Sequence, residues 1–157
     1  MAEDPSYLKP KAQFAALPWR MIDESVEVLM ITSRISRHWL IPKGWPMPGK
    51  SDAAAAAQEA FEEAGIRGGV SSHAIGAYSY DKLRPGAGPV PCVVNVYSLR
   101  VETELSDWKE ASTRERRWMK LGEAASLAFE PGLADLLASI DVRALVADPP
   151  RRRKRSR

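Results

Sequence analysis

The stretch from Gly44 to Ile66 constrains the fold more than any other part of this chain. Ser51-Asp52 offers a helix N-cap, a run of five alanines from Ala53 to Ala57 follows, and Gly65 is a typical C-terminal stop. We therefore predict a helix from about Ala53 to Ala64.

Three acidic residues gather on one face of this helix. Glu59, Glu62 and Glu63 stand at positions i, i+3 and i+4, which share a face. The macrodipole favours cations near a helix C-terminus, so three adjacent anions there call for a bound cation. Carboxylates are hard ligands that suit Mg²⁺ or Mn²⁺. From the helix alone, a solvated acidic surface is the alternative. The opposite face is expected to pack on a core and consists of Ala53, Ala57, Ala60, Phe61 and Ala64.

The loop before the helix favours the metal site. From Pro42 to Lys50 it holds three prolines, two glycines and two lysines, and it follows the apolar strand Trp39–Ile41. Such a loop is stiff and positively charged. A basic loop that faces an acidic metal-binding helix is the arrangement that a phosphate substrate with its metal requires.

The spacing of these residues resembles the signature box of the Nudix hydrolase family. Gly44 stands at the first glycine of the box, Glu59 at the Glu after its Arg position, Glu62-Glu63 at its Glu pair, and Gly65-Ile66 at its closing pair, without a gap. The resemblance implies that Glu59, Glu62 and Glu63 bind a divalent metal, Mg²⁺ or Mn²⁺.

Three positions depart from the box. Lys50 stands where the first Glu is expected, Gln58 where the Arg is expected, and Ala60 where a bulkier apolar residue is usual. Because Glu and Arg at the first two positions can pair in the family, we interpret their joint change as coupled: Lys50 would repel a retained Arg, whereas Gln58 is neutral. The departures leave a second hypothesis open, a Nudix-shaped sensor that binds a nucleotide or polyphosphate without cleaving it. Retention of all three box acids favours the hydrolase.

Segments outside the box resemble the branch of diphosphoinositol-polyphosphate and diadenosine-polyphosphate phosphohydrolases. The matching segments are Thr32–Arg34, Trp39 with Ile41-Pro42 and Gly44, Ser106–Glu110 and Arg114–Leu121, within about residues 14 to 128. The resemblance implies metal-dependent hydrolysis of a pyrophosphate bond, with a diadenosine polyphosphate or an inositol pyrophosphate as the favoured substrate.

The resemblance also assigns roles to residues. Glu59 and Glu63 are expected to be direct metal ligands, and Glu62 a ligand or the group that orients the attacking water. A further acid from a later loop often serves this family as ligand or base; Glu110 and Glu115 are the candidates, and we choose Glu115. The predicted catalytic set is therefore Glu62, Glu63 and Glu115.

Cations and small residues on turns and strand ends form the predicted substrate-binding set, because Arg forks and Lys charges clamp phosphates. Taken singly, each of these charges also fits a solvated surface residue. The set consists of Arg20, Ser33, Arg34, Lys43, Gly44, Lys50 and Arg84.

The remaining pattern predicts an α/β fold. Strands are expected at Gln13–Arg20, Val26–Thr32, Ala74–Asp81, Val90–Glu102 and Arg117–Lys120, with helices beginning at Leu121 and spanning Gly132–Val146. Gly68-Gly69 is expected to break the chain, and residues 83–89 to form a turn. Interleaved strands and helices indicate a sandwich with a mixed sheet, in agreement with the α/β/α sandwich that the resemblance implies.

Length and composition indicate one soluble domain. The chain has 157 residues, 45% hydrophobic and 27% charged. We predict an N-terminal arm over 1–10, a Nudix domain over 11–147 and a disordered basic tail over 148–157. No apolar run is long enough for a membrane span, so we expect a cytoplasmic protein without a membrane partner. The single cysteine, Cys92, allows no internal disulfide and reads as a core residue.

The basic tail raises a third hypothesis. The formal net charge is +3 and residues 151–157 carry six cationic side chains, so the rest of the chain has a net charge of −3. Such a tail can contact nucleic acid nonspecifically, or it can be solvated without a partner. We expect a small-molecule polyphosphate or nucleotide substrate as the partner, and the sequence leaves the oligomeric state open.

Overall fold

The computed structural model describes residues 9–147, in which eight strands form one mixed sheet covered by helices. The strands are β1 (Lys11–Ile22), β2 (Ser25–Thr32), β3 (Trp39–Leu40), β4 (Lys43–Gly44), β5 (Ile66–Val70), β6 (Gly76–Arg84), β7 (Ala87–Glu104) and β8 (Arg116–Lys120). The helices are α1 (Asp52–Ala64), α2 (Leu121–Leu127), α3 (Pro131–Ser139) and α4 (Val142–Val146). The predictions for the first eight residues and for the basic tail lie outside the described residues.

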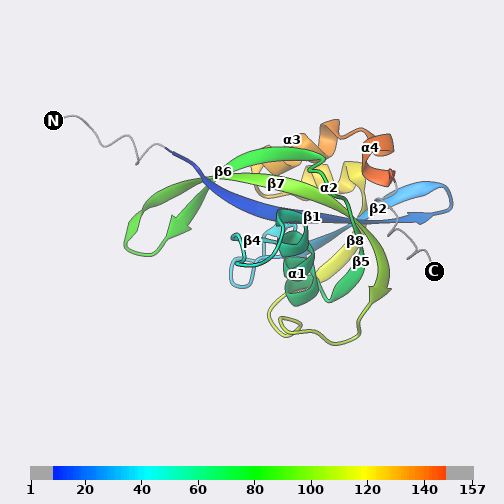
Figure 1. The fold of residues 1–157 in the computed structure, drawn as a ribbon, viewed down its shortest axis with the longest axis horizontal. Coiled ribbons are helices and arrows are strands. Elements are labelled where there is room, and N and C mark those ends of the chain that lie inside the picture. Colours follow the sequence, from blue (N-terminus) through cyan, green and yellow to red (C-terminus); the bar gives the residue numbers. More distant parts are fainter. Residues whose placement is uncertain (1–8, 148–157) are drawn as a thin grey trace.

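Two long strands organise the sheet. β1 pairs in parallel with β7 and antiparallel with β2 and β4, and β7 pairs antiparallel with β5 and β6. β3 and β8 extend the sheet beyond β2. Figure 1 shows β1 and β7 crossing the molecule side by side. The predicted mixed sheet is confirmed.

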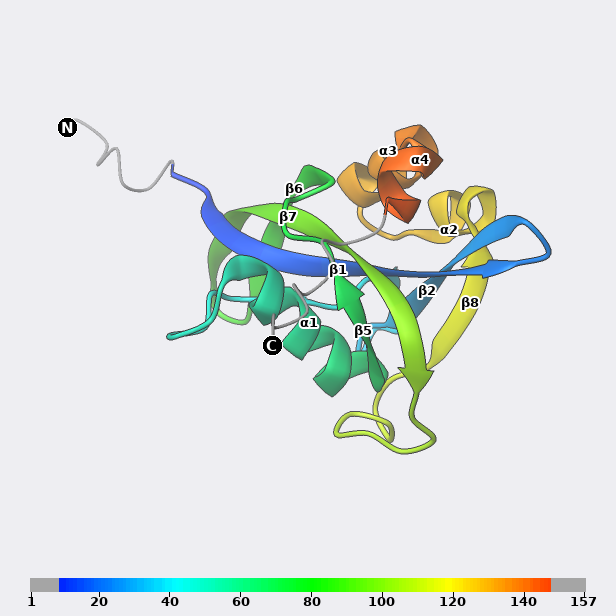
Figure 2. The same cartoon turned by 45° about the vertical axis from the view of Figure 1, so that its right-hand side comes forward.

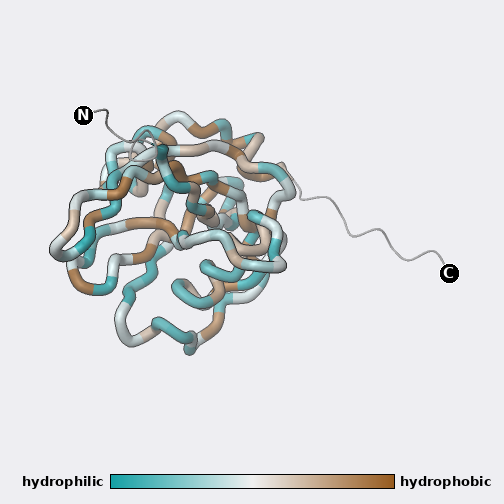
Figure 3. Tube along the Cα trace, turned by 60° about the vertical axis from the view of Figure 1, so that its left-hand side comes forward, coloured by the Kyte–Doolittle hydropathy of each residue, from teal (hydrophilic) through white to brown (hydrophobic). Residues whose placement is uncertain are grey.

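Alternating side chains on β1 divide the interior into two cores. Ala15, Leu17 and Trp19 pack with buried residues of α2, α3 and α4, whereas Phe14 and Ala16 pack with alanines of α1. Successive side chains of a strand point to opposite faces, so one strand supplies both cores. The helices accordingly lie on both sides of the sheet (Figure 2), and hydrophobic and hydrophilic residues alternate in short segments along the trace (Figure 3). The predicted α/β/α sandwich is confirmed.

The ends of α1 follow the sequence signals. The Ser51 side chain accepts a hydrogen bond from the Ala54 amide at 3.1 Å, and Gly65 caps the C-terminus with φ of 66°. Ala56, Ala60 and Ala64 are fully buried and let the helix lie close to the sheet. The faces differ from the prediction, because Glu63 is also buried.

Two local predictions are wrong for identifiable reasons. The expected helix over 132–146 is divided into α3 and α4, because Ile140 and Asp141 are extended and the Asp141 side chain caps α4 through the Arg143 amide. Gly68-Gly69 continues β5 instead of breaking the chain. A Cβ at Gly68 would overlap the Arg100 carbonyl oxygen, so the glycine allows β5 and β7 to approach closely at this point.

The turn predicted over 83–89 is tighter than expected, because β6 and β7 stay paired as far as Arg84 and Ala87. Cys92 is buried, as predicted for a core residue. Over residues 9–147, no helix is long and apolar enough to cross a membrane.

Candidate active site

A cleft of about 770 Å³ opens beside the C-terminal half of α1. Segments far apart in the sequence form its walls: the loop after β2, β4, α1, β6, the loop before β8 and the start of α3. The charged and polar residues that matter most for its chemistry are Ser33, Arg34, Lys43, Glu63, Arg114 and Glu130.

Two acids of the predicted metal set lie together at this cleft. Glu63 is only 7% exposed, and the Glu59 carboxyl lies beside its own. Burial above all, and then the neighbouring Glu59, raises the pKa of Glu63 to about 9, while Arg114 opposes the shift. A Cβ at Gly44 would overlap Oε1 of Glu59, so the glycine leaves the space that the Glu59 carboxylate fills.

This pair has the chemistry of a site for a hard divalent cation. Two adjacent carboxyls, one of them buried, are stabilised by positive charge beside them, which Arg114 supplies in part, and their oxygens suit Mg²⁺ or Mn²⁺. Glu62 is turned elsewhere: its Oε1 lies 3.0 Å from Lys109 Nζ. Within residues 9–147, no three acidic, His or Cys side chains gather as a complete metal cluster. The structure thus brings together Glu59 and Glu63 but not Glu62.

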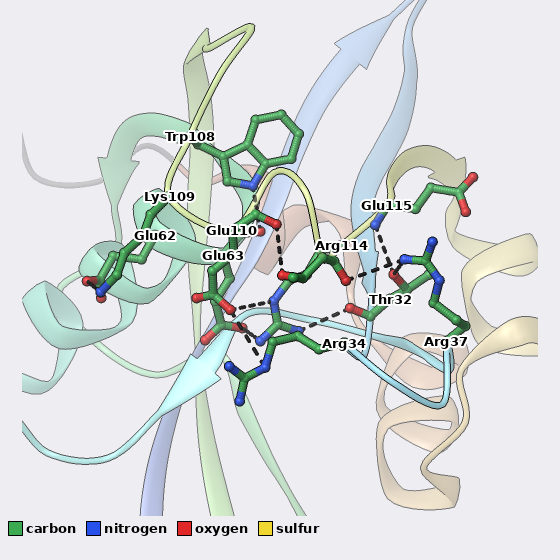
Figure 4. Close-up of polar contacts among 11 residues, drawn as sticks. Thr32, Arg34, Arg37, Glu62, Glu63, Trp108, Lys109, Glu110, Arg114 and Glu115 are labelled. Atoms are coloured by element: carbon green, nitrogen blue, oxygen red, sulfur yellow. Dashed lines mark hydrogen bonds and ion pairs between the residues drawn. The ribbon is translucent and has the colours of Figure 1, made fainter.

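Arg114 links the acids to the sheet, and the sequence analysis missed it as a site residue. Its Nη2 lies 3.5 Å from Glu63 Oε1, its Nε donates to Glu110 Oε1 at 3.1 Å, and its Nη1 donates to the Thr32 carbonyl at 3.0 Å. The side chain is 12% exposed. Figure 4 shows Arg34 approaching the same cluster, with its Nε 4.0 Å from Glu110. The spacing of four residues between Glu110 and Arg114 was the available signal.

The two acids proposed for the later loop occupy different places. The Glu110 carboxylate faces Arg114 and Arg34, and the Glu110 amide donates to the Glu62 carbonyl at 3.2 Å. The Glu115 side chain is exposed and points away from Glu63 in Figure 4, while its amide donates to Thr32 Oγ1 at 2.9 Å. The geometry therefore favours Glu110, the candidate that we did not choose.

Four of the predicted substrate-binding residues lie at or beside the cleft. Ser33, Arg34 and Lys43 line it, and Gly44 borders Glu59. Lys43 is buried between acids: burial lowers the pKa of its amine, and the Glu130 and Glu63 carboxylates oppose that shift.

The other three are not among the described residues that line the cleft. Arg20 pairs with Glu27 at 2.6 Å and stacks over Trp118, Arg84 donates to the Gly88 carbonyl within its hairpin, and Lys50 is exposed in the turn before α1. A cation at a strand end reaches a site only if that end lies at the right edge of the sheet, which the sequence did not reveal.

Comparison with known proteins identifies the family. Residues 12–140, most of the chain, match the model of the NUDIX domain. The chain belongs to the Nudix family. Members of this family generally use divalent metal ions.

Nudix relatives of the expected kinds are found. "Nudix hydrolase 16, mitochondrial" of Arabidopsis thaliana is 35% identical over 71% of this chain. A bovine protein named diphosphoinositol polyphosphate phosphohydrolase 3-beta is 31% identical over 77% of this chain and 70% of its own length. The chain spans 63%, 52% and 54% of the lengths of three Arabidopsis Nudix hydrolases that it matches.

Solved Nudix structures share the fold. A Caenorhabditis elegans Ap4A hydrolase, solved as a binary complex, superposes with a TM-score of 0.62 at 22% identity, covering 82% of this chain and 93% of its own. The predicted resemblance to the Nudix hydrolases is therefore confirmed by both sequence and fold.

Proposed function

We propose that this Nudix protein hydrolyses a pyrophosphate bond with the help of Mg²⁺ or Mn²⁺. The observation that carries the proposal is the Glu59–Glu63 carboxyl pair, packed against Gly44 at the edge of a cleft lined by cations. A hydrolase of this type needs such a metal site beside groups that bind phosphate.

The residues of the chain divide the chemistry among them. Glu59 and Glu63 would hold the metal, which when bound neutralises phosphate charge and activates water. Arg34 and Lys43, which line the cleft, would bind phosphoryl oxygens. Glu110 would act as the base for the attacking water, and Arg114, which donates to its Oε1 at 3.1 Å, would fix the orientation of that carboxylate.

Glu62 keeps its proposed role under one condition. The Glu62 carboxylate has to leave Lys109 before it can bind metal or orient water. The Lys109 side chain is 69% exposed, so it is free to move away.

The cleft favours a dinucleoside polyphosphate over an inositol pyrophosphate. Its lining carries four lysine and arginine residues but also three acids, and Lys43 and Arg114 are already paired with acids. A heavily phosphorylated inositol offers only anionic groups to such a surface. Ile35, Leu83 and Phe129, which line the cleft, are 95%, 81% and 57% exposed, and the Phe129 ring stacks on the His38 ring with 3.6 Å between the ring centroids. Apolar and aromatic surface of this kind suits a base.

The test is metal-dependent turnover across diadenosine polyphosphates, inositol pyrophosphates, ADP-ribose and nucleoside triphosphates, with Mg²⁺ and with Mn²⁺. We expect turnover of a diadenosine polyphosphate, and loss of at least about a hundredfold in Glu63→Gln, because that change removes a ligand charge without changing shape. Glu123→Gln, an exposed acid paired with Arg117, is the control. Tight binding of a panel member without turnover would instead indicate the sensor.

We retain the expectation of a cytoplasmic protein, although three Arabidopsis relatives are named as mitochondrial.

Deleting residues 151–157 tests the hypothesis that the basic tail binds nucleic acid. The deletion should abolish salt-sensitive nucleic-acid binding and leave the turnover of small substrates unchanged.

A further inference from the structure

A buried carboxylate outside the Nudix box faces the same cleft. Glu130 is 7% exposed and stands at the N-cap position of α3, yet its side chain makes no capping hydrogen bond. It turns instead toward the cleft, where its Oε2 lies 3.6 Å from Lys43 Nζ and its Oε1 accepts a hydrogen bond from the Tyr78 hydroxyl at 3.3 Å.

Lys43 is held from several sides. Its side chain is 13% exposed, and its Nζ lies 4.8 Å from the centre of the Tyr80 ring. The Tyr80 hydroxyl in turn donates to Gln13 Oε1 at 2.5 Å. A long, flexible lysine side chain is thereby fixed in a wall of the cleft, one residue before the glycine that borders Glu59.

Stability alone is a weak reason for this arrangement. Replacing a buried ion pair by apolar residues of similar size is often neutral or stabilising, since both charges lose their hydration. The Lys43–Glu130 pair joins β4 to the start of α3 and faces the cleft that also exposes Glu63 and Arg114. This location indicates a part in substrate binding.

We propose that Glu130 is a positioning residue that holds Lys43 Nζ where it meets a substrate phosphate. The inference rests on the proposed function, of which it is an extension to a residue outside the family box. Fixing the lysine before the substrate arrives removes the ordering cost that a mobile lysine adds to binding. Tyr78 holds Glu130 in its turn, so that the order of action is Tyr78, Glu130, Lys43 and phosphate.

Glu130→Gln, Lys43→Met and the double variant test the proposal in steady-state kinetics with diadenosine tetraphosphate and Mg²⁺. We expect KM to rise about tenfold in each single variant, as for the loss of a charged hydrogen bond, with kcat changed less. Because Glu130 acts through Lys43, the double variant should match Lys43→Met alone. Multiplying effects, or a KM for Glu130→Gln equal to or below that of the wild type, would overturn it.

Two further variants separate positioning from folding. Glu104→Gln is the matched control, because Glu104 also pairs at 3.6 Å with a mostly buried cation, Arg116, away from the cleft. It should leave KM unchanged. Tyr78→Phe removes only the hydroxyl that holds Glu130, and should also raise KM, by a smaller factor than Glu130→Gln does. A lower melting temperature for Glu130→Gln or Tyr78→Phe with wild-type KM would mean that the network is only structural.

Binding of inorganic tripolyphosphate in EDTA, measured by calorimetry, needs neither metal nor turnover. Affinity should fall in both Lys43→Met and Glu130→Gln relative to the wild type and Glu104→Gln. If the wild-type protein hydrolyses no panel member, the proposed function fails while this fall still supports the positioning role. Equal affinity in all four proteins would overturn the positioning role even if hydrolysis is found.

Discussion

Arg114 and Arg116 are two residues apart and almost equally buried, with side chains 12% and 15% exposed, yet they serve different regions. Arg114 contacts the acids Glu63 and Glu110. Arg116 donates to main-chain carbonyls of Ala64, Gly65 and Leu105 and stacks over Trp108.

The two arginines offset different negative charges, one at the end of α1 and the other on its acidic side chains. The last turn of α1 contains no basic residue, so Arg116 supplies the cation that the carbonyl end of the helix favours. Arg114 instead offsets the charges of the acids that this helix carries into the cleft. The same short segment therefore holds the helix at its end and orders the site along its side.

Arg114→Lys tests the role of Arg114 in the active site. Lysine keeps the charge but cannot reach two acids and the Thr32 carbonyl at once. We expect kcat/KM to fall by about a hundredfold, in the range seen when one preorganised charged contact is lost. Arg116→Lys is the control. Measured well below the melting temperature of the variant, its kcat/KM should stay within about threefold of the wild-type value. Equal losses in both variants would refute the division of roles.

Arg116→Lys tests the contribution of Arg116 to the stability of the fold. One ammonium cannot satisfy the three carbonyls that the guanidinium reaches. We expect the free energy of unfolding, from urea denaturation, to fall by about 3 kcal/mol, as for two lost hydrogen bonds from a charged donor. Arg114→Lys should cost about 1.5 kcal/mol for its one lost bond to the Thr32 carbonyl. A larger loss in Arg114→Lys would contradict the assignment.

Gly44→Ala and Gly65→Ala sharpen the comparison with one substitution in each half. A methyl group at residue 44 overlaps Glu59 Oε1, so Mn²⁺ affinity should fall about tenfold, with the unfolding free energy changed little. At Gly65, with φ of 66°, alanine is strained and meets the Trp108 side chain. Stability should fall there by about 1–3 kcal/mol. Calorimetric Mn²⁺ titration and urea denaturation of both variants measure the contrast, and a tighter Mn²⁺ site in Gly44→Ala would refute it.

Much of the fold could be predicted because its signals are local. The Ser51 cap, the Gly65 stop and the largely apolar runs of β1 and β2 lie within single elements. The division of the last helix was missed because apolar spacing continues through Ile140-Asp141, although Asp141 is a typical cap residue.

The site could be predicted only as far as the box extends. Glu59 and Glu63 share one helix, whereas Arg114 and Glu130 come from loops about fifty and seventy residues later and meet them only through the sheet topology. For the same reason, Arg20 and Arg84 entered the predicted set although neither lines the cleft. Which edge of a sheet a strand end occupies depends on pairing with distant strands.

The smallest expected effect concerns the two altered box positions. Lys50 is exposed in the turn before α1, and Gln58 lies on that helix beside Phe61 and Arg67. Restoring Glu at Lys50 and Arg at Gln58 together should be tolerated better than either change alone, by about 0.5 kcal/mol in unfolding free energy, if the two positions are coupled. Lys50 precedes α1, and the part of the helix from Asp52 to Gln58 spans roughly 9 Å, so any coupling has to act through long side chains. A double-mutant cycle by urea denaturation decides the question, and simple additivity would mean that the two positions changed independently.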